Sequence, residues 1–441
     1  MSRFIGIAHR VKVRVLKDKP PESRPTKIAI RVDGKVAEYE LATETDELDF
    51  LLGRFPTKHR GILPEDDPTQ FLPHQVVWRS AKKGEDTKAL PRNWLRRDKT
   101  TKQVEVAVKV PVKFDGLRSG DKVALVLSGS GNRLAYAASR IGEQINAEVY
   151  HLPGFKLRER RPEADKDKPD TDHLILAAAL ESEVVEFYRM EPRGDREVVG
   201  FYRMEPRDRD LVALREAYNA RVEAMKARMA ATQRLHAHFI GQMFCNPEGR
   251  YPEGELELAY EAAVASDAVL QALIVEERRR NKEMDKAAER LAVYRELFAP
   301  IKGVGPAIAS RLICAIGDIR QFSTDAKLKA FCGVHVLADG RFPRRRNGEL
   351  ANWKPDCRQA LYLLGDQFNR RPDSVWGKKL REYKIKLRTA HPEVVIGENG
   401  KKKYTDAHIH KMAIWRTLTK FVERLWKEWW ALENEFQRKA A

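Results

Sequence analysis

The chain has 441 residues, with 82 Lys and Arg against 64 Asp and Glu, a formal charge of +18 and an isoelectric point near 9.6. This length allows two or three domains with sizeable cores, and the basic excess predicts a polyanionic partner. No apolar run approaches the length of a membrane span and no signal peptide opens the chain, so we expect nucleic acid as that partner, no membrane, and a cytoplasmic location.

The cysteines are too scattered to form a metal-binding or disulfide framework. They stand alone, without CxxC pairs, in apolar or mixed surroundings: Cys245, Cys314, Cys332 and Cys357. This spacing predicts neither a zinc ribbon nor a disulfide scaffold, and it fits a reducing compartment.

The N-terminal segment alternates in the way that strands do. We predict strands over residues 4–8, 11–15, 27–32 and 36–41, followed by a helix over 43–52. From residue 56 to about 120 the chain is polar, basic and rich in proline, with one strand-like run at 104–112. We interpret this stretch as an insertion that adds nucleic-acid contacts, although a solvated surface excursion explains its composition almost equally well.

A second group of elements follows the insertion. An apolar strand at 122–127 leads through a glycine-rich turn at 128–131 into a helix over 135–145, then a strand at 147–153 and a helix that begins at Asp172. Together with the N-terminal strands, these segments predict a mixed sheet flanked by helices.

Residues 183–210 form a linker that contains a tandem duplication. The heptapeptide Phe-Tyr-Arg-Met-Glu-Pro-Arg occurs at 187–193 and again at 201–207. Two copies are too few for a solenoid, so we interpret the repeat as a slip duplication in a tolerant linker.

Two long helical patterns come next, over 211–243 and 256–297, with a turn between them. They predict an antiparallel coiled-coil arm over 211–297. Periodicity and charge leave two roles open for this arm: a contact with nucleic acid or another subunit, or a spacer stabilised by its own seam.

The most informative stretch begins at residue 298. Ile301-Lys302-Gly303-Val304-Gly305-Pro306 predicts a tight hairpin between helices, because two glycines free the backbone and proline suits a first helical position. A following helix ends at Gly317, and Ser323 begins a second short helix that closes at Gly333. Free amides at the start of a helix favour a phosphate oxygen, so we predict that Lys302, Gly303 and Gly305 contact a nucleic-acid backbone. A compact helix connection is the simpler alternative for the tetrapeptide Gly-Val-Gly-Pro alone.

This hairpin, the run Ala-Ile-Gly-Asp-Ile at 315–319 and the turn Ala-Phe-Cys-Gly-Val at 330–334 together resemble the C-terminal domain of the insertion-sequence-110 family of transposases, which includes the Piv-type DNA invertases. The resemblance covers about residues 301–363. It implies that residues 1–182 form a ribonuclease-H-like (RuvC-like) α/β domain and that 298–390 form a helix-hairpin-helix domain. The apolar pattern of the last segment predicts a C-terminal amphipathic helix within 391–441.

The resemblance also implies four carboxylates that hold two divalent metal ions, such as Mg²⁺, around a phosphodiester. The first two carboxylate positions are substituted, because the chain has Gly6-Ile7-Ala8 and a turn without acids at 128–131. Asp170 and Asp172 match the later pair, with altered spacing, and are our candidates for the catalytic and metal-binding residues. Helix-capping acids are an equally good account of these two aspartates.

The family places a DNA-attacking serine several residues after the Gly333 turn. Asp339 stands at that position here, and no serine occurs between Ser323 and Ser374. A carboxylate does not inherit this role, because a phospho-carboxylate anhydride is far more labile to water than a serine ester.

A basic stretch follows, since residues 341–388 hold 14 Lys and Arg against 5 Asp and Glu, a local charge of +9. We predict nucleic-acid contacts from its arginine clusters: Arg344, Arg345, Arg346, Arg370 and Arg371. Aromatic residues between them can stack on unpaired bases, although we assign Tyr362 to the core, beside three leucines.

The closing helix, over 407–436, has a wide apolar face that we expect to pack against this chain or a sister subunit. His408 and His410 face opposite ways on it, which favours core and capping roles over metal binding.

Two functions therefore compete. One is a DNA transposase or site-specific recombinase that, as the resemblance implies, acts with a structured guide-like RNA and forms a homo-oligomer through the arm and the C-terminal helix. The other is a catalytically inactive derivative that binds nucleic acid. A junction-resolving nuclease would have the same ribonuclease-H-like sheet. The substituted carboxylate positions argue against this activity, as they argue against an active transposase.

Overall fold

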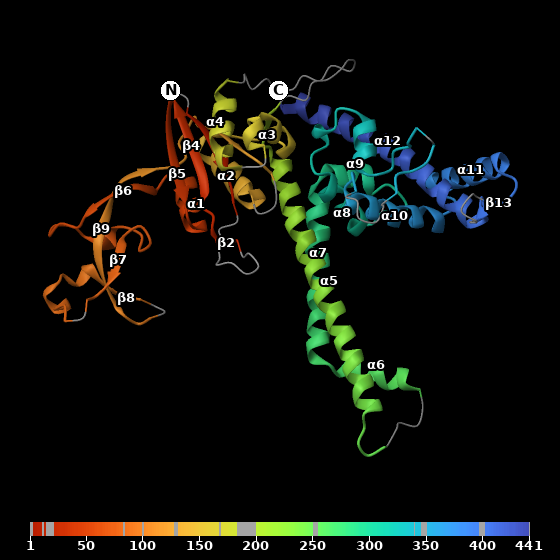
Figure 1. Ribbon diagram of the computed structural model, residues 1–441, viewed down its shortest axis with the longest axis horizontal. Coiled ribbons are helices and arrows are strands. Elements are labelled where there is room, and N and C mark those ends of the chain that lie inside the picture. The colour runs from red at the N-terminus through yellow and green to blue at the C-terminus, as the bar shows by residue number, and fades with distance from the viewer. Residues whose placement is uncertain are drawn as a thin grey trace. The chain divides into compact units, whose positions relative to one another are not determined.

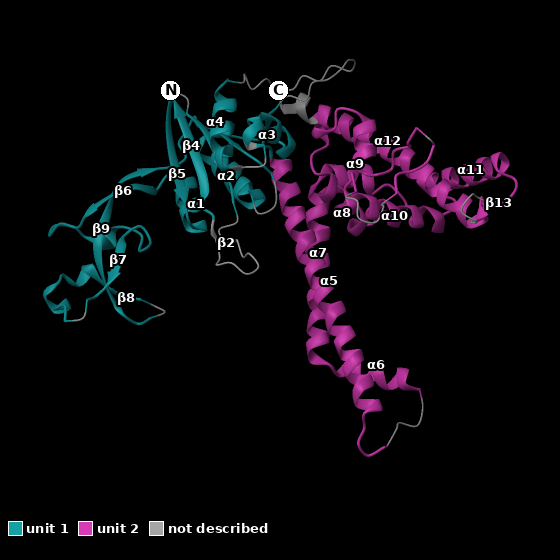
Figure 2. Ribbon diagram, in the orientation of Figure 1, with its two compact units in different colours: residues 1–188, 199–205 teal, residues 189–198, 206–441 magenta. Residues whose placement is uncertain are grey.

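The computed structural model describes residues 3–10, 13–14, 22–82, 84–98, 101–127, 131–166, 169–182, 200–249, 255–338, 340–344, 351–396 and 402–440. The chain divides into two compact units, residues 1–188 with 199–205 and residues 189–198 with 206–441 (Figure 2). Most of the duplicated linker, residues 183–199, lies outside the described residues. The finer division into five segments stays a prediction.

Unit 1 contains a mixed sheet, as predicted, in the order β12-β11-β10-β1-β4-β5 among the described strands. β1 runs parallel to β10 and antiparallel to β4, and β10 runs parallel to β11. This arrangement is consistent with a ribonuclease-H-like α/β domain. The strands are β1 Phe4–Ala8, β4 Thr26–Val32, β5 Lys35–Leu41, β10 Lys122–Leu125, β11 Glu148–His151 and β12 Tyr202–Arg203, with a separate short pair β2 Val13–Arg14 and β3 Glu22–Ser23.

Helices cover both faces of this sheet, because its central strands are apolar on both sides. Ile5 and Ile7 of β1 pack toward the buried side chains of α1 (Glu44–Leu51) and α2 (Gly131–Ile145). On the other face, Ala124 and Tyr150 pack with residues of α3 (Gly154–Arg160) and α4 (Asp172–Ser182). Thr43 caps α1 in a capping box with Asp46.

The predicted insertion has a fold of its own. β9 (Val104–Asp115) pairs antiparallel with β6 (Phe55–Gly61), β7 (Val77–Ser80) and β8 (Leu95–Arg97). We expected one strand here, and a loose surface excursion was the alternative. Both interpretations underestimated the number of strands in this segment. Prolines and charged residues interrupt the alternation that marks a strand in the sequence, but the backbone still pairs with β9.

Two long helices of unit 2, α5 (Pro206–Phe244) and α7 (Ala268–Arg290), pack side by side (Figure 1). Ion pairs such as that between Arg228 and Glu277 link them. The predicted single helix over 256–297 is wrong in two respects. α6 (Leu256–Ser266) ends at Asp267, whose side chain accepts a hydrogen bond from the Leu270 amide and starts α7, and α7 ends at Arg290, before a separate π-helical segment.

The rest of unit 2 is a helical lobe around one apolar core. The described helical segments after α7 are the π-helical η6 (Val293–Phe298), α8 (Pro306–Ile316), the 3-10 helix η7 (Ile319–Gln321), α9 (Asp325–Phe331), α10 (Pro355–Arg370), α11 (Val375–Ala390) and α12 (Asp406–Ala440). A short hairpin pairs β13 (Val395–Ile396) with β14 (Lys402–Lys403). The apolar face of α12 packs into this core, where Leu418, Phe421 and Val422 are buried. The C-terminal helix therefore packs against its own chain.

Several predicted boundaries in this lobe are confirmed and one is shifted. Gly317 ends α8 and Gly333 follows α9, both with positive φ. The cap of α9 is Thr324, which accepts from the Lys327 amide, rather than Ser323. Both hydroxyl residues suit a cap, and only the backbone conformation distinguishes them.

Within the described part of the chain, no single helix is long and apolar enough to cross a membrane, although the bent pair α6 and α7 meets the length and composition test when taken together.

Candidate nucleic-acid interface

The hairpin before α8 has the backbone geometry that its glycines predict. Gly303 adopts φ +94°, which a side chain would strain, and the Val304 amide closes the turn on the Ile301 carbonyl at 3.0 Å. Gly305 is exposed and precedes Pro306, which occupies the first turn of α8. The N-cap of α8 is Gly305, so no side chain caps the first amides of the helix at the positive end of its dipole.

Arg371 lies against this hairpin. A Cβ built on Gly303 would stand 2.8 Å from the Arg371 Cδ, Nε and Cζ atoms, so a larger residue here would displace the flexible Arg371 side chain, while the positive φ is what favours glycine. Gln367 accepts a hydrogen bond from Arg371 Nη1 and holds the guanidinium in place. Lys302 is exposed on the same loop. Four of the predicted nucleic-acid-binding residues, Lys302, Gly303, Gly305 and Arg371, thus come together.

The remaining predicted arginines lie elsewhere or are already paired. Arg370 is 68% exposed and bonds Asp366 at 2.8 Å, one turn earlier on α10. Arg344 is exposed, and its charge acts on His408 at the start of α12. Burial first, and then the nearby charge of Arg344, lower the pKa of His408 from its ordinary value. Arg345 and Arg346 lie outside the described residues.

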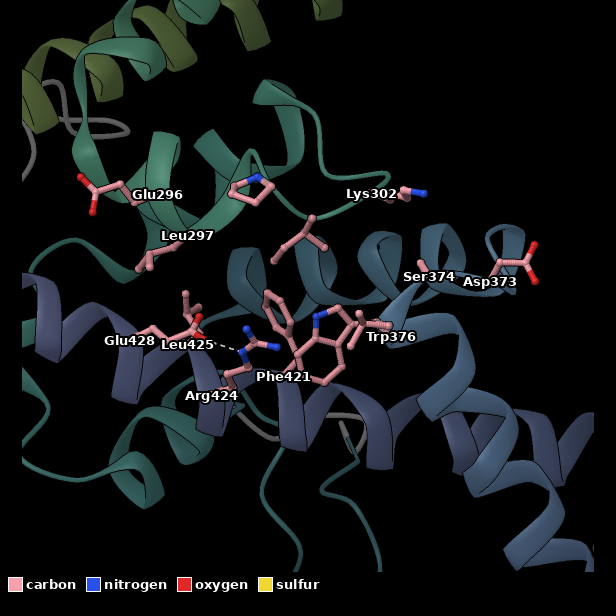
Figure 3. Close-up of a pocket in the computed structure, with 13 residues that line it drawn as sticks. Glu296, Leu297, Lys302, Asp373, Ser374, Trp376, Phe421, Arg424, Leu425 and Glu428 are labelled. Atoms are coloured by element: carbon pink, nitrogen blue, oxygen red, sulfur yellow. Dashed lines mark hydrogen bonds and ion pairs between the residues drawn. The ribbon is translucent and has the colours of Figure 1, made fainter.

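A cavity of about 390 Å³ opens beside the hairpin. Figure 3 shows Trp376 and Phe421 at its centre, Lys302 at one end, and Arg424 paired with Glu428 across the wall. Its volume is in the range of small-molecule sites. The mixture of acidic and basic side chains around it favours no particular ligand charge.

The second predicted centre is the start of α4, which lies directly on β1. A Cβ on Gly6 would stand 2.0 Å from the His173 carbonyl oxygen, so only glycine allows the helix to approach the strand this closely. This approach brings the first turn of α4 to the edge of the sheet where β1 ends at Ala8. The turn at 128–130 and Asp339 lie outside the described residues.

Each of the two candidate carboxylates faces an arginine. Asp172 is buried, and its two oxygens accept hydrogen bonds of 2.8 Å from Nε and Nη2 of Arg161. Asp170 is 67% exposed and bonds Arg10 at 2.7 Å. The Arg10 guanidinium holds the pKa of Asp170 below its usual range, first through this hydrogen bond and then through its charge.

This arrangement does not fit a two-metal centre as it stands. Mg²⁺ needs free carboxylate oxygens, and both oxygens of Asp172 are bonded to a cation that a metal ion would have to displace. The role of Asp170 and Asp172 in catalysis and metal binding stays a prediction.

Sequence reasoning missed three residues at this edge. Arg10 and Arg161 pair with the aspartates, and Glu47 is buried, where it accepts a hydrogen bond from Thr26 at 2.5 Å. Glu47 lies in a helix far along the chain from Asp172, so no spacing pattern connects them. Arg161 ends a basic run at 156–161, which gave a weak signal that a cation would lie near the α4 carboxylates.

Tyr362 is a correction. We assigned it to the core, but it is 55% exposed, while Leu361 and Leu364 are fully buried. The buried face of α10 follows the helical period through Cys357, Ala360, Leu361, Leu364 and Phe368, and Tyr362 falls outside it.

Comparison with curated proteins found no match. Residues 295–340 match the family model described as Transposase IS116/IS110/IS902 family. The matched segment contains the hairpin, α8 and α9, which are the elements on which the resemblance rested. Such a family implies DNA binding and a requirement for a divalent metal, and the match supports a transposase or recombinase role for this chain.

Proposed function

We propose that this protein serves a bacterial insertion sequence by binding its DNA through unit 2, with a structured RNA as a second nucleic acid. The observation that carries the proposal is the hairpin, where the amides at the start of α8 that no side chain caps, the Lys302 ammonium and the Arg371 guanidinium gather at one place. These groups bind phosphate oxygens without reading sequence.

The charge of the neighbouring segment supports the same conclusion. Residues 341–388 contribute a net +9, half of the total of +18. Basic side chains that neutralise phosphates release counterions, so binding should weaken steeply with salt. Oligomerisation through the α5 and α7 arm belongs to this proposal, since most of α5 beyond its first turns is not buried within unit 2.

A second function, strand cleavage and joining, is favoured by the family match and by the mixed sheet. In that case, Asp170 and Asp172 would hold the divalent ion and would have to leave Arg10 and Arg161 when DNA binds. Metal ions in such centres stabilise the attacking and leaving oxygens of the phosphodiester. The arginine pairing favours binding over cleavage.

One experiment separates these two functions. The purified protein is mixed with DNA that carries the ends of its element, RNA transcribed from the flanking DNA, and Mg²⁺ or Mn²⁺. We expect tight DNA binding with no nicked or joined product. Nicking that disappears in Asp172→Asn, with DNA binding retained, would instead establish the enzyme.

A further inference from the structure

Arginines and aromatic rings alternate on one side of the helical lobe of unit 2. The Arg358 guanidinium lies between two indoles, 4.4 Å from the Trp353 ring and 4.8 Å from that of Trp415. The Trp415 ring in turn neighbours Phe342 at 6.2 Å and Tyr362 at 6.5 Å. We call Phe342, Trp415 and Tyr362 the aromatic strip.

The backbone is tied to this strip. Arg358 donates a hydrogen bond of 2.7 Å to the Pro343 carbonyl, and Arg416 donates one of 3.2 Å to the Gly340 carbonyl while it covers the Phe342 ring at 5.5 Å. These bonds fix the segment 340–343 beside α10 and α12. The rings are therefore held in place before any ligand arrives, which lowers the entropy cost of binding.

The strip is open at one end. Tyr362 is 55% exposed, its neighbour Leu363 is 42% exposed, and Trp415 and Phe342 are partly exposed. A tyrosine left uncovered at the end of a row of rings offers a flat face to a ligand.

Charge indicates what that ligand is. Arg358 and Arg416 lie among the rings, and Lys411 is exposed one turn before Trp415 on the same helix face. No acidic residue occurs in the sequence between Asp406 and Glu423, and Asp366 near Tyr362 is paired with Arg370. Because cations lie between the rings, an apolar protein surface would be a poor ligand for the strip. A polyanion that carries flat ring systems would be a good one.

Nucleic acid with unpaired bases combines both properties, whereas a duplex hides the faces of its bases in the stack. We infer that the aromatic strip is a stacking platform for unpaired bases of a nucleic-acid strand. This inference rests on the proposed function, and it adds that unit 2 binds opened or single-stranded nucleic acid at a place separate from the hairpin residues.

The test measures fluorescence anisotropy of labelled single strands of deoxythymidine and of uridine, and of a duplex of equal length, at one salt concentration. Tyr362→Ala should weaken single-strand binding about tenfold, since stacking on one aromatic is worth roughly 1–3 kcal/mol per base. Tyr362→Phe should retain it. Arg416→Ala should weaken it too, and duplex binding by the Tyr362 variants should stay within about twofold of the wild type.

Matched controls come from the same chain. Tyr136→Ala removes a tyrosine that is 40% exposed on α2 of unit 1, and Arg140→Ala removes an arginine from the same helix, 58% exposed and paired with Glu143. Both should leave single-strand binding unchanged. Thermal midpoints confirm that the variants are folded.

The outcomes are separable. Single-strand binding that survives Tyr362→Ala, or an equal loss for single strand and duplex, would overturn the stacking platform and leave the proposed function intact. A wild-type protein that binds no nucleic acid would overturn the proposed function itself. Tighter binding of the deoxythymidine strand assigns the platform to DNA, and tighter binding of the uridine strand assigns it to RNA.

Discussion

The pairing of Asp172 with Arg161 dominates the chemistry at the start of α4. Both side chains are largely buried and meet through two parallel hydrogen bonds, the geometry in which an arginine binds a carboxylate most strongly. A carboxylate held in this way stabilises the fold of unit 1 whether or not it ever binds a metal ion.

The stability of two aspartate variants tests this interpretation. Asp172→Ala leaves the Arg161 charge buried without its partner, so we expect a loss of about 3 kcal/mol in the free energy of unfolding. Asp170→Ala removes an exposed partner of Arg10 and should cost less than about 1 kcal/mol. Denaturant unfolding of both variants measures the difference, and equal losses would contradict the structural role of Asp172.

His408 predicts a dependence of stability on pH. Its pKa is lowered in the folded chain, so the unfolded chain takes up the proton first as pH falls. The stability contribution is therefore complete above the ordinary pKa of about 6.5 and declines as pH falls from there toward the lowered pKa. Thermal unfolding should show a smaller loss between about pH 7.5 and 5.5 in His408→Gln than in the wild type.

The His408→Gln substitution would not remove the whole loss of stability at low pH. Burial also lowers the pKa of His335 and of His410, so the His408 variant should keep part of the decline. A variant with the full wild-type decline would show that His408 titrates as it does in the unfolded chain.

The residues that sequence reasoning placed well are those whose role depends on local conformation. Gly303, Gly305 and Pro306 determine a turn through their own backbone preferences, and the structure has that turn. Arg10 could not be assigned, because its partner Asp170 is far along the chain and only the fold brings the two together. Arg161 was signalled only weakly, by the basic run that it ends. Tyr362 was misplaced because a run of leucines around it was given more weight than the helical period.

Among the elements, the packing of α4 on β1 depends on a single glycine. Gly6→Ala would place a methyl carbon 2.0 Å from the His173 carbonyl oxygen, and relief requires the helix to move off the strand. We expect a loss of about 3 kcal/mol or more in the free energy of unfolding. Gly61→Ala, in β6, is the control, because no atom lies within 4 Å of its added Cβ. A Gly6 variant as stable as this control would show that α4 does not contact β1 in this way.

Helices and strands whose boundaries depend on their own sequence could be predicted, and those that depend on pairing with a distant segment could not. The strands β1, β4, β5 and β10 and the helix α1 were predictable, because each carries its own alternation, apolar run or cap. The antiparallel sheet of the insertion was not, since β6, β7 and β8 are short, irregular strands that gain their structure by pairing with β9. The break at Asp267 went unnoticed because apolar residues continue on both sides of it.

At the scale of the whole molecule, the two units differ in what they offer a nucleic acid. Unit 1 has a mixed sheet with its candidate carboxylates paired to arginines, while unit 2 carries most of the excess positive charge and the hairpin that we propose binds phosphate. The composition predicted a polyanionic partner, and the order of elements predicted the sheet. Side-chain pairings at the sheet edge required the structure.

The salt dependence of DNA affinity shows whether the basic stretch at 341–388 binds DNA. It is measured for the wild type and for a variant in which Arg344, Arg345 and Arg346 are all changed to Ala. A control variant changes Arg278, Arg279 and Arg280 on α7 to Ala, so that it loses the same amount of charge. In the wild type, Arg279 and Arg280 already pair with glutamates. We predict that the first variant binds all DNA sequences more weakly and that its slope of log affinity against log salt is shallower by about 2–3, roughly 0.9 for each phosphate that is no longer neutralised. An affinity and a slope equal to those of the wild type would contradict the claim that this basic stretch binds DNA.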